Sequence, residues 1–318
     1  MSRVTDITCA WRIPAAVGRA IDSRQPQRAA PRTRRRRRGS EPPVATPHTA
    51  PGSPGASLAG RVALVTGGAT KIGQGVVEAL AAQGAAVVVA DIDDDALATL
   101  PPGVDAQHAD VTDDDALAAL VAGCLARHGR LDVVVNLAAT YLDDGATTSR
   151  SDWLRGLDVN LVSAARLVEL ARGPLAAHGT GAVVNVTSIS SSVAQTGRWV
   201  YPVSKAALVQ LTRLQALDLA GDGIRVNSVS PGWTWSHVIE EASAGDLAHA
   251  DDVASAFHML GRLGRPREVG EVVAFLASDR ASVVTGADWA ADGGYSALGP
   301  EQRTPAIPLL APDRTTAP

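Results

Sequence analysis

Cysteine is scarce in this chain of 318 residues. Only Cys9 and Cys124 are present, and two thiols cannot form a disulfide framework. No spacing of Cys and His resembles a zinc site, so we expect no metal ligands. Continuous apolar runs are short, as in Ala85–Ala90 and Val133–Val135, and none approaches the roughly 18 residues that a membrane helix needs. The sequence therefore predicts a chain without a membrane span that works in the cytoplasm, where thiols stay reduced.

Lysine is nearly absent as well. Lys71 and Lys205 are the only lysines among 29 basic residues. Arginine cannot replace lysine where a compact charge on a flexible stem must approach a reacting group. Both positions are therefore candidates for chemistry, although chance retention explains Lys71 equally well.

Charge is distributed unevenly along the chain. Residues 1–57 contain eleven Arg, five of them in the run Arg34–Arg38, and carry a net charge of +8. The remaining residues carry a net charge of −12. An acidic body argues against nucleic acid as the partner of the folded part.

The two ends of the chain have the composition of extensions. Residues 1–57 are rich in Pro, Ala, Ser and Arg and lack the apolar segment of a signal peptide. A transit peptide, a nucleic-acid-binding arm, an over-long start and a disordered tail without a catalytic role all have this composition, and we favour the last. Residues 299–318 are expected to be irregular, which leaves residues 58–298 as a single domain.

Between the two ends, short apolar runs alternate with longer helical patterns. The expected strands are Val62–Thr66, Ala85–Ala90, Val104–Ala109, Leu131–Asn136, Ala182–Thr187, Ile224–Val229 and Thr285–Ala290. The expected helices are Ile72–Gln83, Asp113–His128, Trp153–Arg172, Val203–Ala220 and Arg267–Ser278. This alternation predicts an α/β fold of three layers, a doubly wound parallel sheet of about seven strands. The first four strands lack polar alternation, so we expect both of their faces to be covered.

A glycine-rich turn joins the first expected strand to the first expected helix. Its residues are Thr66-Gly67-Gly68-Ala69-Thr70-Lys71-Ile72-Gly73. A turn of this kind at a helix start directs backbone N–H groups and the positive end of the helix dipole at a pyrophosphate. A tight turn of an unrelated α/β protein is the alternative interpretation.

The second expected strand leads to Asp91, about 20 residues beyond the glycine-rich turn. A carboxylate there accepts hydrogen bonds from both ribose hydroxyls and repels a 2′-phosphate. The sequence therefore favours NAD over NADP. Lys71 keeps NADP open, because a cation in the turn could bind a phosphate.

Tyr201 and Lys205 lie four residues apart at the start of an expected helix, so they share one face. A free phenol has a pKa of about 10, and a neighbouring cation favours the phenolate. This pair is suited to proton transfer near neutral pH. Ser188, thirteen residues earlier, could hold a substrate oxygen, although the run Ser190-Ser191-Ser192 also permits an ordinary turn.

These motifs, in this order, resemble the short-chain dehydrogenase/reductase family. The resemblance covers residues 58–298 and rests on Thr66-Gly67…Gly73, Asp110, Asn136-Leu137-Ala138-Ala139, Asn160, Ser188, Tyr201…Lys205, Pro231-Gly232 and Asp292-Gly293-Gly294-Tyr295. It implies a single-domain Rossmann-type fold and an NAD(P)-dependent enzyme that interconverts a secondary alcohol, or a cyclic diol, and its ketone. It also implies a homo-tetramer or homo-dimer whose partner copies pack through helices Trp153–Arg172 and Val203–Ala220.

The resemblance implies a catalytic tetrad. Tyr201 would be the acid/base, Lys205 would lower its pKa and bind the nicotinamide ribose, and Ser188 would orient the substrate. Asn160 would anchor a water that relays protons to Lys205. The implied cofactor contacts are Gly67, Lys71, Ile72, Gly73, Asp91, Asp110, Val111, Asn136, Ala138, Tyr201, Lys205, Pro231, Gly232, Thr234 and Ser236.

Within that set, the resemblance assigns Asp110 to the adenine and gives Asn136 the task of holding the central strands together. Thr234 and Ser236 would lie near the nicotinamide carboxamide. Two positions depart from the family pattern. Lys71 replaces the middle glycine of the turn, which puts the phosphate contacts in doubt. Leu137 and Ala139 replace the usual Asn and Gly, which we expect to alter packing more than chemistry.

Tryptophans near the expected site bear on the substrate. Trp199, Trp233 and Trp235 flank the position of the reacting carbon and favour an apolar or cyclic substrate, unless they only pack beneath the segment Ser236–Leu260. That segment stands where the family has a mobile lid. Two other functions remain open. One is a catalytically silent dinucleotide-binding regulator. The other is a nucleic-acid-binding or partner-docking protein that uses its basic tail, with the folded domain as a scaffold.

Overall fold

The computed structural model describes residues 57–299 and 307–310. Its sheet has seven parallel strands in the order β3-β2-β1-β4-β5-β6-β7. The strands are β1 (Val62–Thr66), β2 (Ala86–Asp91), β3 (Asp105–His108), β4 (Val133–Asn136), β5 (Ala182–Val186), β6 (Arg225–Pro231) and β7 (Asp288–Ala291). The predicted doubly wound α/β fold is confirmed. The expected tails lie outside the described residues, apart from their innermost positions and a 3₁₀ turn at Ile307–Leu310.

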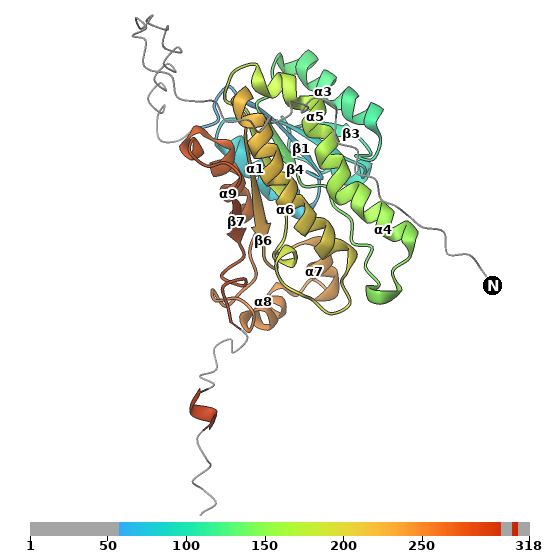
Figure 1. Cartoon of the computed structure of the whole chain (residues 1–318), viewed down its shortest axis with the longest axis vertical. Helices are drawn as coiled ribbons and strands as arrows, with labels where there is room; N and C mark the ends of the chain where they lie inside the picture. Colours follow the sequence, from blue (N-terminus) through green and yellow to red (C-terminus); the bar gives the residue numbers. More distant parts are fainter. Residues whose placement is uncertain (1–56, 300–306, 311–318) are drawn as a thin grey trace, which may run out of the picture. The chain divides into compact units, whose positions relative to one another are not determined.

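Helices cover both faces of the sheet (Figure 1). Helices α1 and α9 pack on one face, and α3, α5 and α6 pack on the other. The helices are α1 (Lys71–Ala82), α2 (Asp94–Ala98), α3 (Asp114–His128), α4 (Arg150–Leu157), α5 (Ser163–Ala176), α6 (Val200–Leu219), α7 (His237–Ala242), α8 (Leu247–Ser255) and α9 (Pro266–Ala277). Among the described residues, no helix has the length and apolarity to span a membrane.

The central strands show why their sequence lacks polar alternation. In β1, Ala63 and Val65 pack into the core beneath α1 and α9, whereas Val62 and Leu64 pack into the core beneath α3 and α5. All four side chains are buried. Successive side chains of a strand point to opposite faces, so a strand covered twice must be apolar throughout.

Strand β3 differs from the expectation. It lies at the edge of the sheet, and its residues alternate between half-buried and exposed. Asp105 and Gln107 are the half-buried residues, and the exposed His108 contacts Asp94. The prediction that both faces of the first four strands are covered is therefore wrong for β3, because one face of this edge strand, that of Ala106 and His108, is open to solvent.

The expected helix Trp153–Arg172 is interrupted. A π-helical turn, Asp158–Val162, separates α4 from α5. Widened turns of this kind are rare and often occur at functional sites. The buried Asn160 lies within this turn.

The chain reverses its direction of travel across the sheet between β1 and β4. After β1 it adds β2 and β3 on one side, and it then returns to place β4 on the other side of β1. Thr66 and Asn136 end these neighbouring strands in register. Ligands of open α/β sheets bind at the carboxyl ends of the strands where this reversal occurs.

Candidate active site

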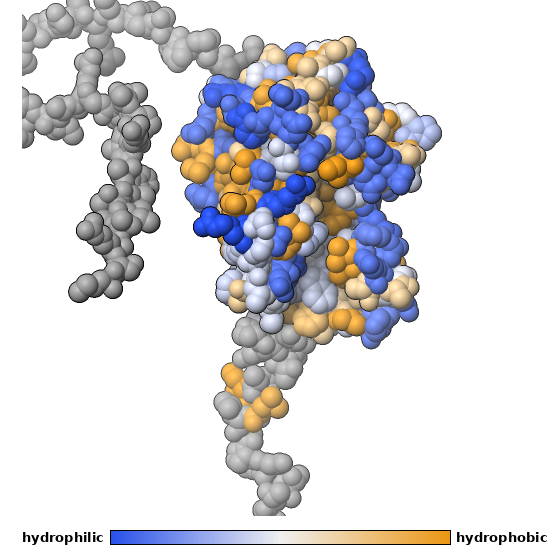
Figure 2. Space-filling model, turned by 90° about the vertical axis from the view of Figure 1, so that its right-hand side faces the viewer, coloured by the Kyte–Doolittle hydropathy of each residue, from blue (hydrophilic) through white to orange (hydrophobic). Residues whose placement is uncertain are grey.

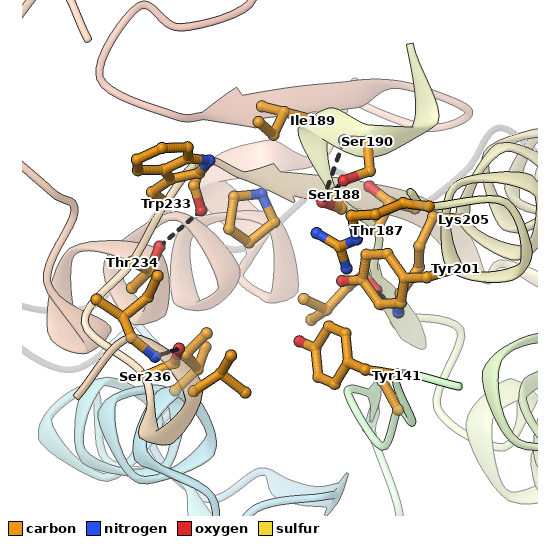
Figure 3. Close-up of a pocket in the computed structure, with 18 of the residues that line it drawn as sticks. Tyr141, Thr187, Ser188, Ile189, Ser190, Tyr201, Lys205, Trp233, Thr234 and Ser236 are labelled. Atoms are coloured by element: carbon orange, nitrogen blue, oxygen red, sulfur yellow. Dashed lines mark hydrogen bonds between the residues drawn. The ribbon is translucent and has the colours of Figure 1, made fainter. Parts of the chain in front are cut away.

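A cavity of about 550 Å³ opens beside the carboxyl ends of β5 and β6. Tyr141, Tyr201 and Lys205 lie on one side of it, and Trp233, Thr234 and Ser236 lie on the opposite side (Figure 3). Of the predicted site residues, the cavity is lined by Lys71, Ile72, Ser188, Tyr201, Lys205, Pro231, Gly232, Thr234 and Ser236. The remaining predicted residues are Gly67, Gly73, Asp91, Asp110, Val111, Asn136, Ala138 and Asn160, none of which lines this cavity.

The turn between β1 and α1 is tightly closed. Gly67 has a positive φ of 69°, and a Cβ there would lie 2.7 Å from the backbone of Ala138. A Cβ on Gly73 would lie 2.3 Å from the carbonyl oxygen of Gly67. Thr70 caps α1 by accepting a hydrogen bond from the Gly73 N–H at 3.1 Å. Only glycine permits this close approach, and the turn leaves the start of α1 at the cavity, an arrangement that fits a pyrophosphate.

Asp91 ends β2 beside this turn. One carboxylate oxygen accepts a hydrogen bond from the Ala69 N–H at 3.1 Å, and the other accepts one from the Ile92 N–H at 2.9 Å. The side chain is half-buried. The turn and the carboxylate together have the geometry that the ribose and pyrophosphate of a dinucleotide require.

Tyr201 lies in the first turn of α6. The carboxylate of Asp143 holds this turn, because one of its oxygens accepts hydrogen bonds from the N–H groups of Trp199, Val200 and Tyr201 at 2.9, 2.7 and 3.2 Å. The Tyr141 ring stacks on the Tyr201 ring, with centroids 4.6 Å apart and planes 26° apart. The phenol that the sequence singled out is thus fixed by a capped helix and by a second phenol.

Opposing influences act on the pKa of Tyr201. Burial raises the pKa well above its ordinary value, and the neighbouring Tyr141 phenol raises it further. Hydrogen bonding with Ser188 and the positive charge of Arg198 lower it. The Arg198 guanidinium carbon lies 4.8 Å from the Tyr201 ring centroid, and an Arg198 nitrogen lies 3.6 Å from Asp143.

Lys205 is 2% exposed and reaches the same ring from inside the protein. Its Nζ donates a hydrogen bond to the carbonyl oxygen of Val186 at 2.8 Å and lies 5.5 Å from the Tyr201 ring centroid. Burial lowers the pKa of the Lys205 ammonium to about 8. The ammonium therefore remains largely charged at neutral pH.

Ser188 follows β5 and begins a short 3₁₀ turn. Its hydroxyl oxygen accepts a hydrogen bond from the Ser190 N–H at 3.1 Å and lies 3.2 Å from the Ser190 hydroxyl. The serine-rich segment is thus a turn, as one interpretation of the sequence held, and the same turn brings Ser188 to the cavity.

Asn160 does not line the cavity, but it contacts Ser204, the neighbour in sequence of the cavity-lining Lys205. Its Nδ2 donates hydrogen bonds to the Ser204 hydroxyl and the Thr140 carbonyl oxygen, both at 3.0 Å. Its Oδ1 accepts one from the Thr140 N–H at 2.7 Å. Ser204 precedes Lys205 on α6, so Asn160 joins the π-helical turn to the helix that carries the two candidate catalytic residues.

The other predicted contacts lie around the sheet. Asn136 donates a hydrogen bond to the side chain of Asn185 at 2.8 Å and so links β4 to β5. Asp110, beyond the end of β3, accepts hydrogen bonds from the Thr112 N–H and hydroxyl, which lower the pKa of its carboxyl. Val111 packs against the core beneath α3. No group of three or more potential metal ligands occurs among the described residues.

Lys71 is paired with the segment that covers the cavity. Its Nζ donates a hydrogen bond to Glu240 of α7 at 2.8 Å. Of the three tryptophans considered, Trp233 lines the cavity. Trp235 packs with Ala250 and Leu263, and Trp199 is half exposed.

The family model described as enoyl-(acyl carrier protein) reductase matches residues 67–296. The chain belongs to the short-chain dehydrogenase/reductase family. The resemblance inferred from the motifs is confirmed. The protein is an NAD(P)-dependent oxidoreductase, a short-chain alcohol dehydrogenase or ketoreductase.

Relatives of known activity cover the same part of the chain. Cis-4-hydroxycyclohexanecarboxylate dehydrogenase of Sinomonas cyclohexanicum is 40% identical over 253 residues, which are 77% of this chain and 100% of that protein. Cyclohexanol dehydrogenase of Acinetobacter sp. (strain SE19) is 33% identical over 245 residues, 74% of this chain and 95% of that protein. The solved structure of ligand-free Thermoplasma acidophilum aldohexose dehydrogenase matches with a TM-score of 0.72 and 28% identity, over 77% of this chain and 98% of that one.

Four residues of the site were not predicted from the sequence. Tyr141, Asp143 and Arg198 surround Tyr201, and Glu240 pairs with Lys71. Tyr141 is one of only three tyrosines, which is the one signal that could have drawn attention to it. Nothing local marks the two carboxylates, because each acts on a residue more than fifty positions away.

Proposed function

We propose that this enzyme interconverts a secondary alcohol on a small ring and the corresponding ketone, with Tyr201 as the proton-transfer group. The observation that carries the proposal is the phenol of Tyr201, which lines the cavity together with Ser188 and Lys205. The half of the cavity opposite these residues is bounded by Trp233, an aromatic surface suited to a ring.

Each side chain has a separate task in alcohol oxidation. Tyr201 takes the proton of the substrate hydroxyl, and Ser188 holds the oxygen on which charge changes. The charge of Arg198 favours the phenolate form of Tyr201, and we propose that the Lys205 ammonium, 5.5 Å from the ring centroid, acts in the same direction. A nicotinamide dinucleotide held at the turn Gly67–Gly73 and at Asp91 would supply the acceptor for the hydride. In ketone reduction the phenol returns the proton.

Asn160 supports this exchange from behind the cavity. Its contacts with Thr140 and Ser204 hold the start of α6 against the π-helical turn. We propose that the polar groups beside Asn160 organise a water path to Lys205, as the resemblance implies.

NAD is the proposed cofactor. The Asp91 carboxylate stands beside the phosphate-binding turn, where it would repel a 2′-phosphate. Lys71 is the cation that made NADP an alternative cofactor. Its charge is neutralised by the Glu240 carboxylate. Its charge is therefore not free to offset Asp91.

Two of the similar enzymes are named for alcohols on a cyclohexane ring. We extend that substrate class to this chain because its cavity combines Trp233 with apolar neighbours such as Leu137, Ile189 and Val238. One of these substrates also bears a carboxylate. Arg198 is the cation of the cavity placed next to Tyr201 that could meet such a group.

Replacement of Tyr201 by Phe tests the proposal. With cyclohexanol and cis-4-hydroxycyclohexanecarboxylate as substrates, Tyr201→Phe should lower kcat/KM by at least about 100-fold, because proton transfer is lost. Binding of the dinucleotide, measured by quenching of tryptophan fluorescence, should persist. The same assays run with NAD and NADP separately should show a higher kcat/KM with NAD. Unchanged turnover in Tyr201→Phe would remove the mechanism, and a wild-type protein that binds dinucleotide without turning over any alcohol would be a regulator instead.

A further inference from the structure

Lys71 occupies an unusual place for a lysine. It is the first residue of α1, where the family pattern has a glycine and where a pyrophosphate would meet the helix. Its Nζ nevertheless turns away to the Glu240 carboxylate on α7, 169 residues later in the chain, at 2.8 Å. A side chain of the phosphate-binding turn is thus bonded to the segment that covers the cavity.

The surroundings strengthen this contact. The Lys71 Nζ also lies 5.8 Å from the ring centroid of Trp235, which precedes α7. The second oxygen of Glu240 lies 3.8 Å from a ring nitrogen of His237. Hydrogen bonding and charge from Lys71, with a contribution from the His237 ring, hold the pKa of the Glu240 carboxyl below its ordinary value. The carboxylate is therefore ionised wherever the enzyme operates near neutral pH.

Apart from Lys71, helix α7 is held by the packing of Ile239 on the cluster of Ala250, Ala254 and Leu263 and by its Ser236 cap. It is six residues long, and none of its residues is buried. It is followed by Ala244, whose positive φ of 51° is strained for a residue with a Cβ. Short elements with little buried surface open easily, so one ion pair can change how often α7 is closed.

We propose that Lys71 is a positioning residue, which holds α7 over the cavity through Glu240 and so couples the phosphate-binding turn to closure of the substrate site. The inference rests on the proposed function only for what closure of the cavity does in the reaction. The contact between Lys71 and Glu240 is present in the protein without ligand. Because Glu240 neutralises it, Lys71 contributes little to the choice between NAD and NADP.

Hydrogen exchange of the α7 amides, measured without dinucleotide, tests the contact independently of turnover. In Glu240→Gln and Lys71→Gln, exchange of residues 237–242 should become about two- to five-fold faster, the range that a partly exposed ion pair supports. Lys71→Arg should keep the wild-type rate, because it keeps the charge. Glu241→Gln is the matched control, since Glu241 is exposed and adjacent to Glu240 on the same helix.

Steady-state kinetics supply the second readout. Both single variants should raise KM for the alcohol by a similar factor with little change in kcat, and the double variant should be no worse than either single one. The ratio of kcat/KM with NAD to that with NADP should stay within about two-fold of the wild-type ratio.

Three results would overturn the inference. The first is unchanged α7 exchange in both single variants, and the second is additive effects in the double variant. The third is a KM for NADP that rises in Lys71→Gln but not in Glu240→Gln, which would assign the lysine to a phosphate. If the variants show the expected differences in α7 exchange but the wild-type protein oxidises no alcohol, only the proposed function is contradicted.

Discussion

Tyr201 has two neighbouring side chains that act on its pKa in opposite directions. Tyr141 stacks on its ring and raises the pKa, whereas the Arg198 guanidinium, 4.8 Å from the ring centroid, lowers it. Burial alone would hold the phenol protonated. The pKa of Tyr201, the proposed proton-transfer group, is therefore shifted by burial, Tyr141, Ser188 and Arg198.

Paired substitutions at these neighbours should move the pH profile in opposite directions. Arg198→Gln removes a charge that favours the phenolate, so the midpoint of kcat for alcohol oxidation should move to higher pH by up to about one unit. Tyr141→Phe removes the group that raises the pKa, so its midpoint should move to lower pH. The measurement is kcat against pH with saturating alcohol and NAD.

Arg213→Gln provides the control, because Arg213 is an exposed arginine of α6 that bonds to Gln210. Its profile should match that of the wild type. If both site variants shifted the midpoint in the same direction, or neither moved it, Tyr201 would not be the group that titrates.

At the scale of elements, local pattern predicted what depends on neighbouring residues. The seven strands and the long helices lie within about four residues of their expected positions, because strands covered on both faces leave short apolar runs in the sequence and helices leave an apolar period of about 3.6 residues. The turn Gly67–Gly73 and the Tyr201–Lys205 pair were predictable because each is set by the spacing of residues that are close in the sequence.

Features that depend on distant partners were not predictable in this way. Asp143 fixes the first turn of α6 from 58 residues before Tyr201, through N–H groups that any sequence would provide. The π-helical turn at Asp158–Val162 interrupts a continuous helical pattern, and the exposed face of β3 depends on its place at the sheet edge. Tertiary position, rather than local propensity, decides all three.

The packing of α1 against α9 gives a prediction for the elements themselves. A Cβ on Gly75 of α1 would lie 2.3 Å from the carbonyl carbon of Pro266, which is backbone and cannot move aside. Gly75→Ala should therefore lower the free energy of unfolding by about 1–3 kcal/mol, the cost of overpacking, although Ala is the better helix former. Urea unfolding followed by circular dichroism measures the change.

Gly123→Ala in α3 is the comparison, because an added Cβ there meets only the end of the flexible Arg127 side chain within 3.4 Å. That variant should be as stable as the wild type or more stable by up to about 1 kcal/mol. Equal stability of both variants would show that α1 and α9 separate without cost.

At the scale of the whole molecule, polar residues cover much of the surface, with apolar residues scattered among them on the face shown in Figure 2. The folded part is acidic, since residues beyond 57 carry a net charge of −12. Helix α6 departs from this pattern. Val203, Leu214 and Leu217 lie at helical spacing on one face of α6 and are about half exposed or more. Leu154 of the adjacent α4 is also exposed.

A second copy of the chain would cover this face, as the resemblance implies for a homo-dimer or homo-tetramer. The double variant Leu214→Glu/Leu217→Glu should dissociate the assembly, because it places two like charges on each side of a two-fold contact and removes apolar area. Leu217 alone is 76% exposed in the single chain, so the double variant should fold normally, with an unchanged circular dichroism spectrum. Sedimentation velocity measures the mass. Val283→Glu, at a position 93% exposed outside α4 and α6, should leave the mass unchanged, and a wild-type chain that sediments as a monomer at micromolar concentration would contradict the prediction.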